Sequence, residues 1–223
     1  MTDQLDSRTL HNTDCYGQRF MRAGTYRYAV GPAGAPGWTR EFPYIVEVVD
    51  QPDGKDKAMA QRTVMVRRDG REFLPDAERI TIDVGDMVTW HSPDARTRPF
   101  AVTGEKAFFG SHRLVNESGY THIFTSADIY EWADAHGSQL HGTVRVTDPQ
   151  CRTAEDVRAW QERLGEGTLV MISDGRAEPR EVEVLIGQTV LFAVVDGPGV
   201  SITDTRLLEP GRKAPGREAH STA

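Results

Sequence analysis

The chain has 223 residues, of which 38% are hydrophobic and 26% are charged, and its formal net charge is −7. This length suits two domains of roughly 100 residues, each large enough to bury a core of its own. The negative charge and the lack of a long basic run argue against nucleic acid and anionic membranes as partners. No apolar run approaches the ~18 residues that span a bilayer, so we expect no membrane insertion.

The N-terminal sequence does not have the basic and apolar regions of a signal peptide. We therefore expect a cytoplasmic protein, or a periplasmic or secreted one if the sequence starts after a removed signal. Cys15 and Cys151 show no metal-type spacing. Free thiols in a reducing compartment fit them, with a disulfide between the two as the alternative.

Strand patterns dominate the chain. Residues 80–84 alternate apolar and polar side chains, Gly85-Asp86 signals a turn, and residues 88–90 alternate again. Strands of the same kind are expected at 44–48, 143–146, 182–186 and 190–192. Short alternating strands between Gly, Pro and Asp turns predict an all-β fold of antiparallel sandwiches.

One helix interrupts the strands. It is expected to open at Arg152 or Thr153, to carry Glu155 and Asp156 in its first turn, and to end at Gly165. We expect its apolar face to pack at the junction between two domains.

Two internal matches show that the chain is duplicated. Residues 5–50 resemble residues 109–154, and residues 63–103 resemble residues 168–203. In the first match, Tyr, Phe, Ala, Tyr and a final aromatic residue recur at one constant offset. A self-match of this kind decides the architecture, and we interpret it as out of order. One unit is then continuous in the middle of the chain, and the other is split between its two ends.

The continuous unit resembles a cupredoxin, the Greek-key β-sandwich of plastocyanin and amicyanin. The resemblance covers nearly all of residues 63–147 and rests on the order and spacing of several short motifs. These motifs are residues 64–66, 73–75, 80–86 and 88–90 for the opening strands, and residues 109–114, Phe124, 130–132 and 142–146 for the closing strands.

The split unit then resembles a second, circularly permuted cupredoxin. Its two pieces either close within one chain or complete a neighbouring chain by domain swapping, and we expect closure within the chain. The predicted organisation is a continuous cupredoxin-like domain at 61–148, a discontinuous one formed by 5–50 with 168–208, a helical linker at 149–167 and a mobile tail at 209–223.

The resemblance implies a type 1 copper ion held by two imidazoles, one thiolate and a weak axial thioether. The residues at the ligand positions do not supply this set. They are Phe100, Asp134, Gly137 and Leu140 in the continuous unit, and Val200, Val30 and Ala33 in the split unit. Neither unit has the thiolate of a blue-copper centre, so electron transfer is not expected.

A different metal site is the alternative. The loop at 131–141 keeps Asp134, His136 and His141, and His91 is expected near the same end of the sandwich. Two imidazoles and a carboxylate suit Zn²⁺ or Cu²⁺, although loop spacing alone sets no geometry.

Other polar residues are given structural roles. His122 shares a strand face with Phe124, and we expect it to be a hydrogen-bonded core histidine. His11 and His220 lie near the termini without neighbouring ligands, and no site is expected there. No serine or cysteine sits in a motif that pairs a nucleophile with a base, which argues against an enzyme.

The sequence therefore predicts a cupredoxin-like binding or assembly protein that has lost its type 1 copper site. It needs no cofactor and acts through a protein partner or self-association. The alternative is a copper- or zinc-binding protein, or an accessory subunit of a redox enzyme, that uses the rebuilt site in the 131–141 loop.

Overall fold

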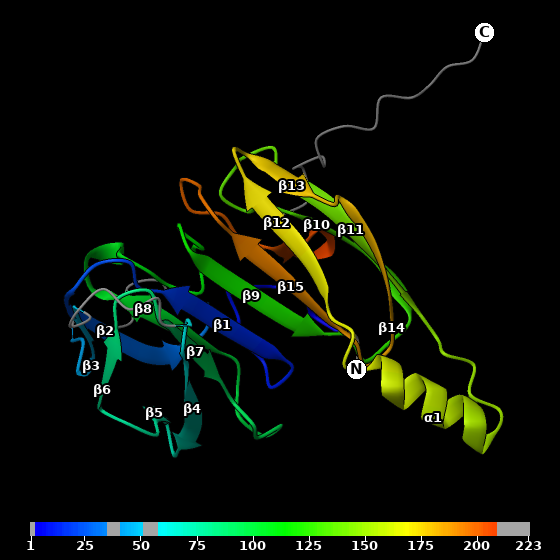
Figure 1. Cartoon of the computed structure of the whole chain (residues 1–223), viewed down its shortest axis with the longest axis horizontal. Helices are drawn as coiled ribbons and strands as arrows, with labels where there is room; N and C mark the ends of the chain where they lie inside the picture. The colour runs from blue at the N-terminus through cyan, green and yellow to red at the C-terminus, as the bar shows by residue number, and fades with distance from the viewer. Residues whose placement is uncertain (1–2, 35–40, 51–57, 209–223) are drawn as a thin grey trace, which may run out of the picture.

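The computed structural model describes residues 3–34, 41–50 and 58–208. It confirms an all-β fold with one α-helix in this part of the chain (Figure 1). The predicted tail at 209–223 lies outside the described residues. The strands are β1 (Asp14–Arg19), β2 (Gly24–Pro32), β3 (Tyr44–Val49), β4 (Gln61–Asp69), β5 (Glu72–Pro75), β6 (Arg79–Asp83), β7 (Met87–His91), β8 (Phe100–Gly104), β9 (Ser118–Ile123), β10 (Asp128–Ala133), β11 (His141–Thr147), β12 (Thr168–Ser173), β13 (Arg176–Glu178), β14 (Glu181–Leu185), β15 (Thr189–Val194) and β16 (Thr203–Asp204); the helix is α1 (Ala154–Arg163), and two short 3₁₀ turns are η1 (Glu105–Ala107) and η2 (Thr205–Leu207).

The strands form one long sheet and two short ones. The long sheet has the order β13-β12-β15-β9-β1-β7-β4-β5, and the short sheets have the orders β6-β3-β2-β8 and β14-β11-β10-β16. Strands such as β6 and β14 alternate exposed and buried residues, which is the pattern of a strand with one face on a core.

Each short sheet covers one half of the long sheet. In one half, the rings of Tyr28 on β2 and Trp90 on β7 lie 5.4 Å apart. In the other half, Trp132 on β10 and Phe192 on β15 are also 5.4 Å apart. The result is two β-sandwiches that share a sheet. We call β1–β8 the first sandwich and β9–β16 the second sandwich.

The predicted pairing of segments is wrong. Strand β3 pairs with β6, and β1 pairs with β7, so residues 5–50 are completed mainly by residues 61–104 and not by 168–208. The predicted continuous domain at 61–148 is divided, because β9–β11 pack with β12–β16. The duplication is therefore a tandem repeat in simple order. Strands β6 and β14 carry the same pattern, so the sequence did not show which of them pairs with β3, whereas a short connection favours the nearer one.

The two sandwiches meet where β1 pairs antiparallel with β9. Tyr16 lies directly opposite Tyr120, and the two tyrosines occupy the same position in the two repeats. Tyr16 also pairs with Trp90, just as Tyr120 pairs with Phe192. Such a self-matching register is that of a two-fold symmetric interface, here formed within one chain. It lets us assign the strand residues of one sandwich their counterparts in the other.

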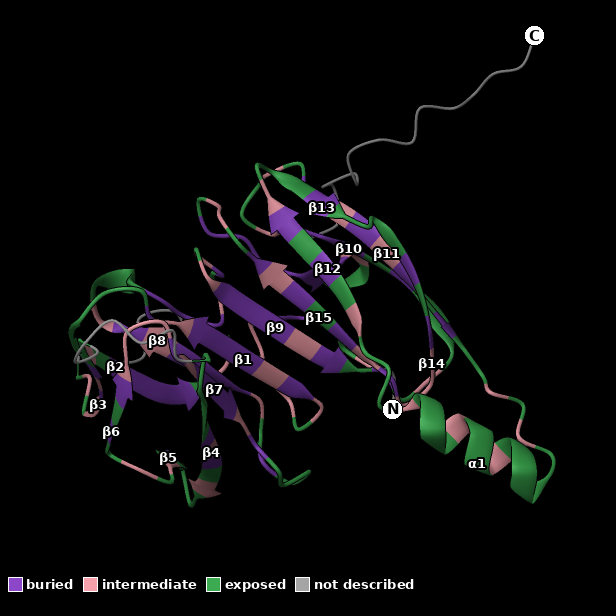
Figure 2. Cartoon of the chain, viewed as in Figure 1, coloured by how far each residue is buried: buried purple, intermediate pink, exposed green. Residues whose placement is uncertain are grey.

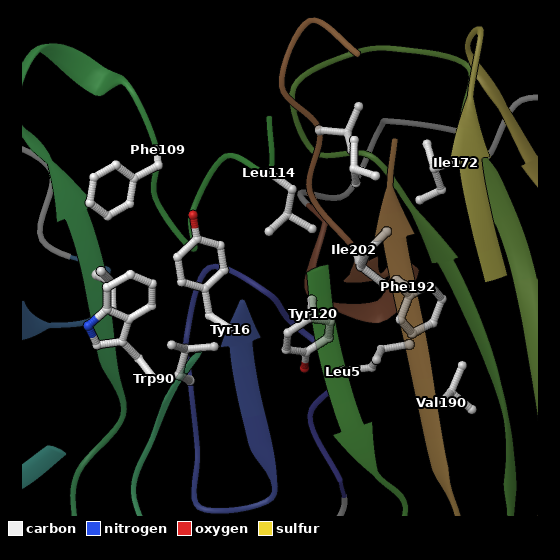
Figure 3. Close-up of a cluster of buried hydrophobic side chains, with 14 of the residues drawn as sticks. Leu5, Tyr16, Trp90, Phe109, Leu114, Tyr120, Ile172, Val190, Phe192 and Ile202 are labelled. Carbon is white, nitrogen blue, oxygen red and sulfur yellow. The ribbon is translucent and has the colours of Figure 1, made fainter. Parts of the chain in front are cut away.

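The segments before β1 and β9 each cross to the opposite sandwich. Leu5 accepts a hydrogen bond from the amide of Asp204 (2.7 Å), while its counterpart Phe109 accepts one from Gly104 (2.8 Å). Phe109 also stacks on Trp90, with a centroid distance of 5.7 Å. Figure 3 shows Phe109 beside Trp90, and Leu5 beside Phe192 in the other core. Each sandwich is therefore completed by a segment that belongs to the other repeat.

Helix α1 confirms the predicted start but not the predicted location. Thr153 and Asp156 form a capping box at its N-terminus. The indole Nε1 of Trp160 donates to the carbonyl of Ile186 (2.8 Å), and a Cβ at Gly187 would clash with Leu164. The helix thus joins β11 to β12 within the second sandwich and packs on its end rather than at the junction.

Burial follows the sheets and leaves the helix exposed. Figure 2 shows buried residues along β1, β9 and β15 and mainly exposed residues along α1. No helix in the described ranges is long and apolar enough to cross a membrane.

Candidate functional site: an arginine-lined pocket

A pocket of about 690 Å³ lies at one end of the first sandwich. Its walls come from the segment before β1, the end of β2, the β4–β5 hairpin and the loop before β8. This volume is within the range of pockets that hold small organic ligands. The lining residues among those described are Gln4, Thr9, His11, Pro32, Ala33, Arg68, Arg71, Phe73, Arg98 and Pro99.

Three arginines give the pocket its charge. Arg68, Arg71 and Arg98 all line it, and none has an ion pair or side-chain hydrogen bond with another described residue. No described lining residue is acidic. Since the chain as a whole is at −7, this is a local concentration of positive charge against the net charge of the molecule.

His11 lies in the same wall. Its backbone is fixed by Asp14, whose carboxylate accepts from the His11 amide (2.6 Å) and whose own amide donates to the His11 carbonyl (3.1 Å). The imidazole Nε2 is shielded from solvent and has no hydrogen-bond partner among the described residues. Such a buried nitrogen costs free energy, but because solvent does not reach it, it is not evidence for a ligand.

The β4–β5 hairpin places two of the arginines. Val66 pairs with Pro75 nine positions later (75 − 66), while its counterpart Ile172 pairs with Ala177 five positions later (177 − 172). The hairpin of the first sandwich is therefore four residues longer, and Arg68 and Arg71 lie in the extension. Gly70 adopts a φ of +56° at its tip, a left-handed value that glycine adopts without strain.

The same place in the second sandwich is filled. Leu10 bridges to Phe100, and its counterpart Leu114 bridges to Val200, so Thr9 corresponds to Arg113 and Arg98 to Pro198. The Arg113 guanidinium donates to the Pro198 carbonyl (2.7 Å).

The stem of Arg113 also fills the space beside Gly199, where any Cβ would clash with it. His11 likewise has the apolar counterpart Val115. A long side chain thus occupies in one repeat the space that threonine leaves open in the other.

Asp134, one of the predicted metal ligands, is used as a structural cap. Its carboxylate is buried and accepts hydrogen bonds from the amides of Ser201 (2.8 Å), Ser138 (2.9 Å) and His136 (3.1 Å). Burial alone would raise the pKa of Asp134, but these hydrogen bonds outweigh it and hold the pKa below its usual value. The carboxylate therefore organises the 134–140 loop.

The other predicted ligands point to separate partners. His136 Nε2 contacts the carbonyl of His112 (2.9 Å), and His141 Nδ1 contacts the carbonyl of Gln139 (2.8 Å). His91 pairs with Cys15 in the first sandwich. Among the described residues, no group of three or more His, Cys, Asp or Glu side chains is placed to hold a metal ion. The structure thus does not bring the four predicted ligands together.

A buried polar network joins the sandwiches beside the pocket wall. His122 Nδ1 lies 2.6 Å from Asp14 Oδ1, and the Tyr120 hydroxyl donates to the same oxygen (2.9 Å). All three side chains are at most 2% exposed, so a ligand does not reach them. The prediction that His122 is a hydrogen-bonded core histidine is confirmed.

Cys15 and Cys151 are both free thiols, as predicted, and they do not form the alternative disulfide. Burial raises the pKa of the Cys15 thiol to about 11, which makes it a poor nucleophile at neutral pH.

Sequence patterns did not predict His11, Arg68, Arg71 and Arg98 as lining residues of one pocket. They are 87 positions apart along the chain at the extremes (98 − 11), and no spacing rule connects them. The one available signal was the longer hairpin after Val66. Comparisons with protein-family models, with curated proteins and with solved structures found no match to this chain.

Proposed function

We propose that this chain is a non-enzymatic binding protein, built on two cupredoxin-like sandwiches without type 1 copper, whose ligand occupies the pocket of the first sandwich. The observation that carries the proposal is the pocket itself, with three arginines in its wall that have no ion pair or side-chain hydrogen bond among the described residues. Arg71 and Arg98 are exposed and Arg68 is half-buried, so they are free to bind a ligand, and the convergence of several charged groups on one cavity is the usual arrangement of a binding site.

The resemblance to cupredoxins supports the position of the site. Ala33, at a histidine position of the predicted split unit, lines the pocket, and Phe100, at a histidine position of the predicted continuous unit, follows the lining residue Pro99. The pairing of β2 with β8 brings the two positions together in the first sandwich. Strand pairing puts Val30, at the cysteine position, next to Val102 on β8. On this proposal, the end of the sandwich that serves metal binding in the family serves ligand binding here.

The test is a ligand screen by NMR on the full chain. Wild type and Thr9→Arg are titrated with a panel of neutral sugars, amino acids, carboxylates and phosphates. We expect at least one class to shift the amide resonances of His11 and Arg98 in wild type but not in Thr9→Arg. Stoichiometric copper or zinc, bound by wild type and lost in His136→Ala/His141→Ala, would instead support the metal-binding alternative.

Association with a protein partner or a second copy is a second proposal. The outer face of the second sandwich exposes Leu169, Met171 and Leu191, and Leu169 lies directly beside Leu191 in the sheet. Exposed apolar side chains that adjoin each other are typical of contact surfaces. Sedimentation of wild type and Leu169→Glu/Leu191→Glu checks self-association. A monomer for wild type at all concentrations would exclude a second copy as the partner.

The two free cysteines support a reducing, cytoplasmic location, as the sequence predicts.

A further inference from the structure

We propose that the ligand of this pocket is a small organic polyanion, with at least two carboxylate or phosphate groups on an apolar or mixed body. This inference rests on the proposed binding function and names the ligand class of the same site. It follows from the number of arginines, their lack of partners and the composition of the remaining wall.

The charge of the wall calls for more than one anionic group. Arg68, Arg71 and Arg98 bring three guanidinium groups, each with a fork of donors that matches a carboxylate or phosphate. They come from two separate elements, the β4–β5 hairpin and the loop before β8, and all three line the cavity. One anionic group satisfies one or two such forks, and a second group is needed for the rest.

The size and the apolar part of the wall call for an organic body. A cavity of about 690 Å³ is far larger than an inorganic phosphate ion, which leaves most of it empty. Phe73, Pro32 and Pro99 supply apolar surface between the arginines. Phe73 is buried and packs toward Phe100 (centroids 6.3 Å apart), so this part of the wall belongs to the hydrophobic core.

The second sandwich supports the assignment by contrast. The counterpart of Arg98 is Pro198, the hairpin extension with Arg68 and Arg71 is missing there, and Arg113 fills the space. All the features that suit a polyanion are thus confined to the repeat in which the cavity is open.

The experiment is isothermal titration calorimetry of the full chain with four probes: citrate, fructose 1,6-bisphosphate, inorganic phosphate and glucose. We expect citrate or fructose 1,6-bisphosphate to bind, phosphate to bind at least about tenfold more weakly, and glucose not to bind. The two polyanions separate a carboxylate ligand from a phosphate ligand. Raising the salt concentration should weaken binding, since the arginines at the rim are screened.

Arginines that lie on the same two elements but outside the pocket serve as controls for a general charge effect. Arg71→Gln and Arg98→Gln remove lining charges, and each should weaken polyanion binding by about tenfold or more, which is the loss of one charged hydrogen-bonded contact. Arg67→Gln and Arg96→Gln remove the same charge from the same hairpin and the same loop at positions outside the pocket lining. These controls should change the affinity by less than about twofold.

The outcomes separate the two proposals. Polyanion binding that all four variants weaken equally would show a general charge effect and overturn the inference. Binding of glucose as tight as that of the polyanions, lost in Thr9→Arg, would overturn the polyanion but keep the pocket as a binding site. No binding of any probe, together with no response in the NMR screen, would overturn both.

Discussion

The two sandwiches are repeats of one sequence pattern, yet the arginine-lined pocket lies in the first sandwich, and the corresponding place in the second is filled by Arg113. They share strand order and register, and counterpart aromatic residues such as Tyr16 and Tyr120 fill their cores. They differ at one end, where Thr9 in the first sandwich faces a cavity and its counterpart Arg113 fills the space. The repeated core residues therefore specify the scaffold. The residue at the position of Thr9 and Arg113 and the length of the β4–β5 hairpin decide whether a pocket is open at the end of the sandwich.

The joint between the sandwiches shows a second asymmetry. Asp14 lies opposite His122 at one end of the β1–β9 pair, and their counterparts Ser118 and Gln18 lie opposite each other at the other end. A buried carboxylate–imidazole contact at one end is matched by a neutral pair at the other. The same strand register therefore accommodates a carboxylate–imidazole contact at one end and two neutral side chains at the other.

Asp14→Ala should have the largest effect on stability. It leaves the His122 imidazole and the Tyr120 hydroxyl without their partner inside the joint, and breaking a buried pair of this kind costs about 3–5 kcal/mol. Urea unfolding measures this loss. The neutral end provides the control: Ser118→Ala should cost under about 2 kcal/mol, since only one neutral hydrogen bond is lost. Equal costs at the two ends would contradict the asymmetry.

Phe109→Ala tests the exchange of segments between the repeats. Phe109 is 3% exposed and stacks on Trp90, so its removal should cost about 3–5 kcal/mol. Phe108→Ala is the matched control, because that side chain is 63% exposed and should contribute little. NMR should locate the damage from Phe109→Ala in the first sandwich. Damage confined to the second sandwich would show that residue 109 belongs to its own repeat.

Thr9→Arg copies the arrangement of Arg113 into the first sandwich. The new side chain should fill the cavity with its guanidinium on the Arg98 carbonyl, as that of Arg113 is on the Pro198 carbonyl. The lost space should outweigh the added positive charge and weaken ligand binding by about tenfold or more, equivalent to about 1.4 kcal/mol. Stability should change by less than about 1 kcal/mol, since the site is not in the core. The reverse change, Arg113→Thr, should open space in the second sandwich without creating polyanion binding. Calorimetry checks both, and binding gained by Arg113→Thr would contradict a role for the three arginines.

Asp134 contributes a stabilisation that depends on pH. Its counterpart is the apolar Val30, which cannot supply this carboxylate in the first sandwich. Because the folded-state pKa of Asp134 is depressed below 3.8, its contribution is fully present above that value and is lost as the pH falls through the folded-state pKa. Asp134→Asn should cost about 1–3 kcal/mol at pH 7 and progressively less below about pH 4. A cost that is the same at pH 3 and pH 7 would show that ionised Asp134 is not the stabilising form.

The scaffold could be predicted well from the sequence, because it depends on local patterns. The alternating runs at 80–84 and 182–186 became β6 and β14, and Thr153 capped the expected helix. Pairing was harder, since β3 meets equivalent patterns in both repeats and sequence similarity does not distinguish them.

The site was beyond the reach of the same patterns. Its residues are brought together by the close approach of the hairpin, the segment before β1 and the loop before β8, and none of these is periodic. The carboxylate of Asp134, a predicted metal ligand, instead accepts hydrogen bonds from backbone amides. This depends on the local path of the 134–140 loop, which no periodic pattern predicts. The alternative metal site was predicted in the loop with histidines at 131–141, whereas the open cavity lies in the first sandwich.

The most direct test of the pocket is a heteronuclear NMR titration of the full chain with fructose 1,6-bisphosphate and citrate. We predict saturable shifts that cluster at His11, Arg71 and Arg98 in the first sandwich, with none at their counterparts near Pro198. Shifts that cluster around Asp134 and His136 instead, or that spread over the surface without saturating, would contradict the assignment of the binding site to the first sandwich.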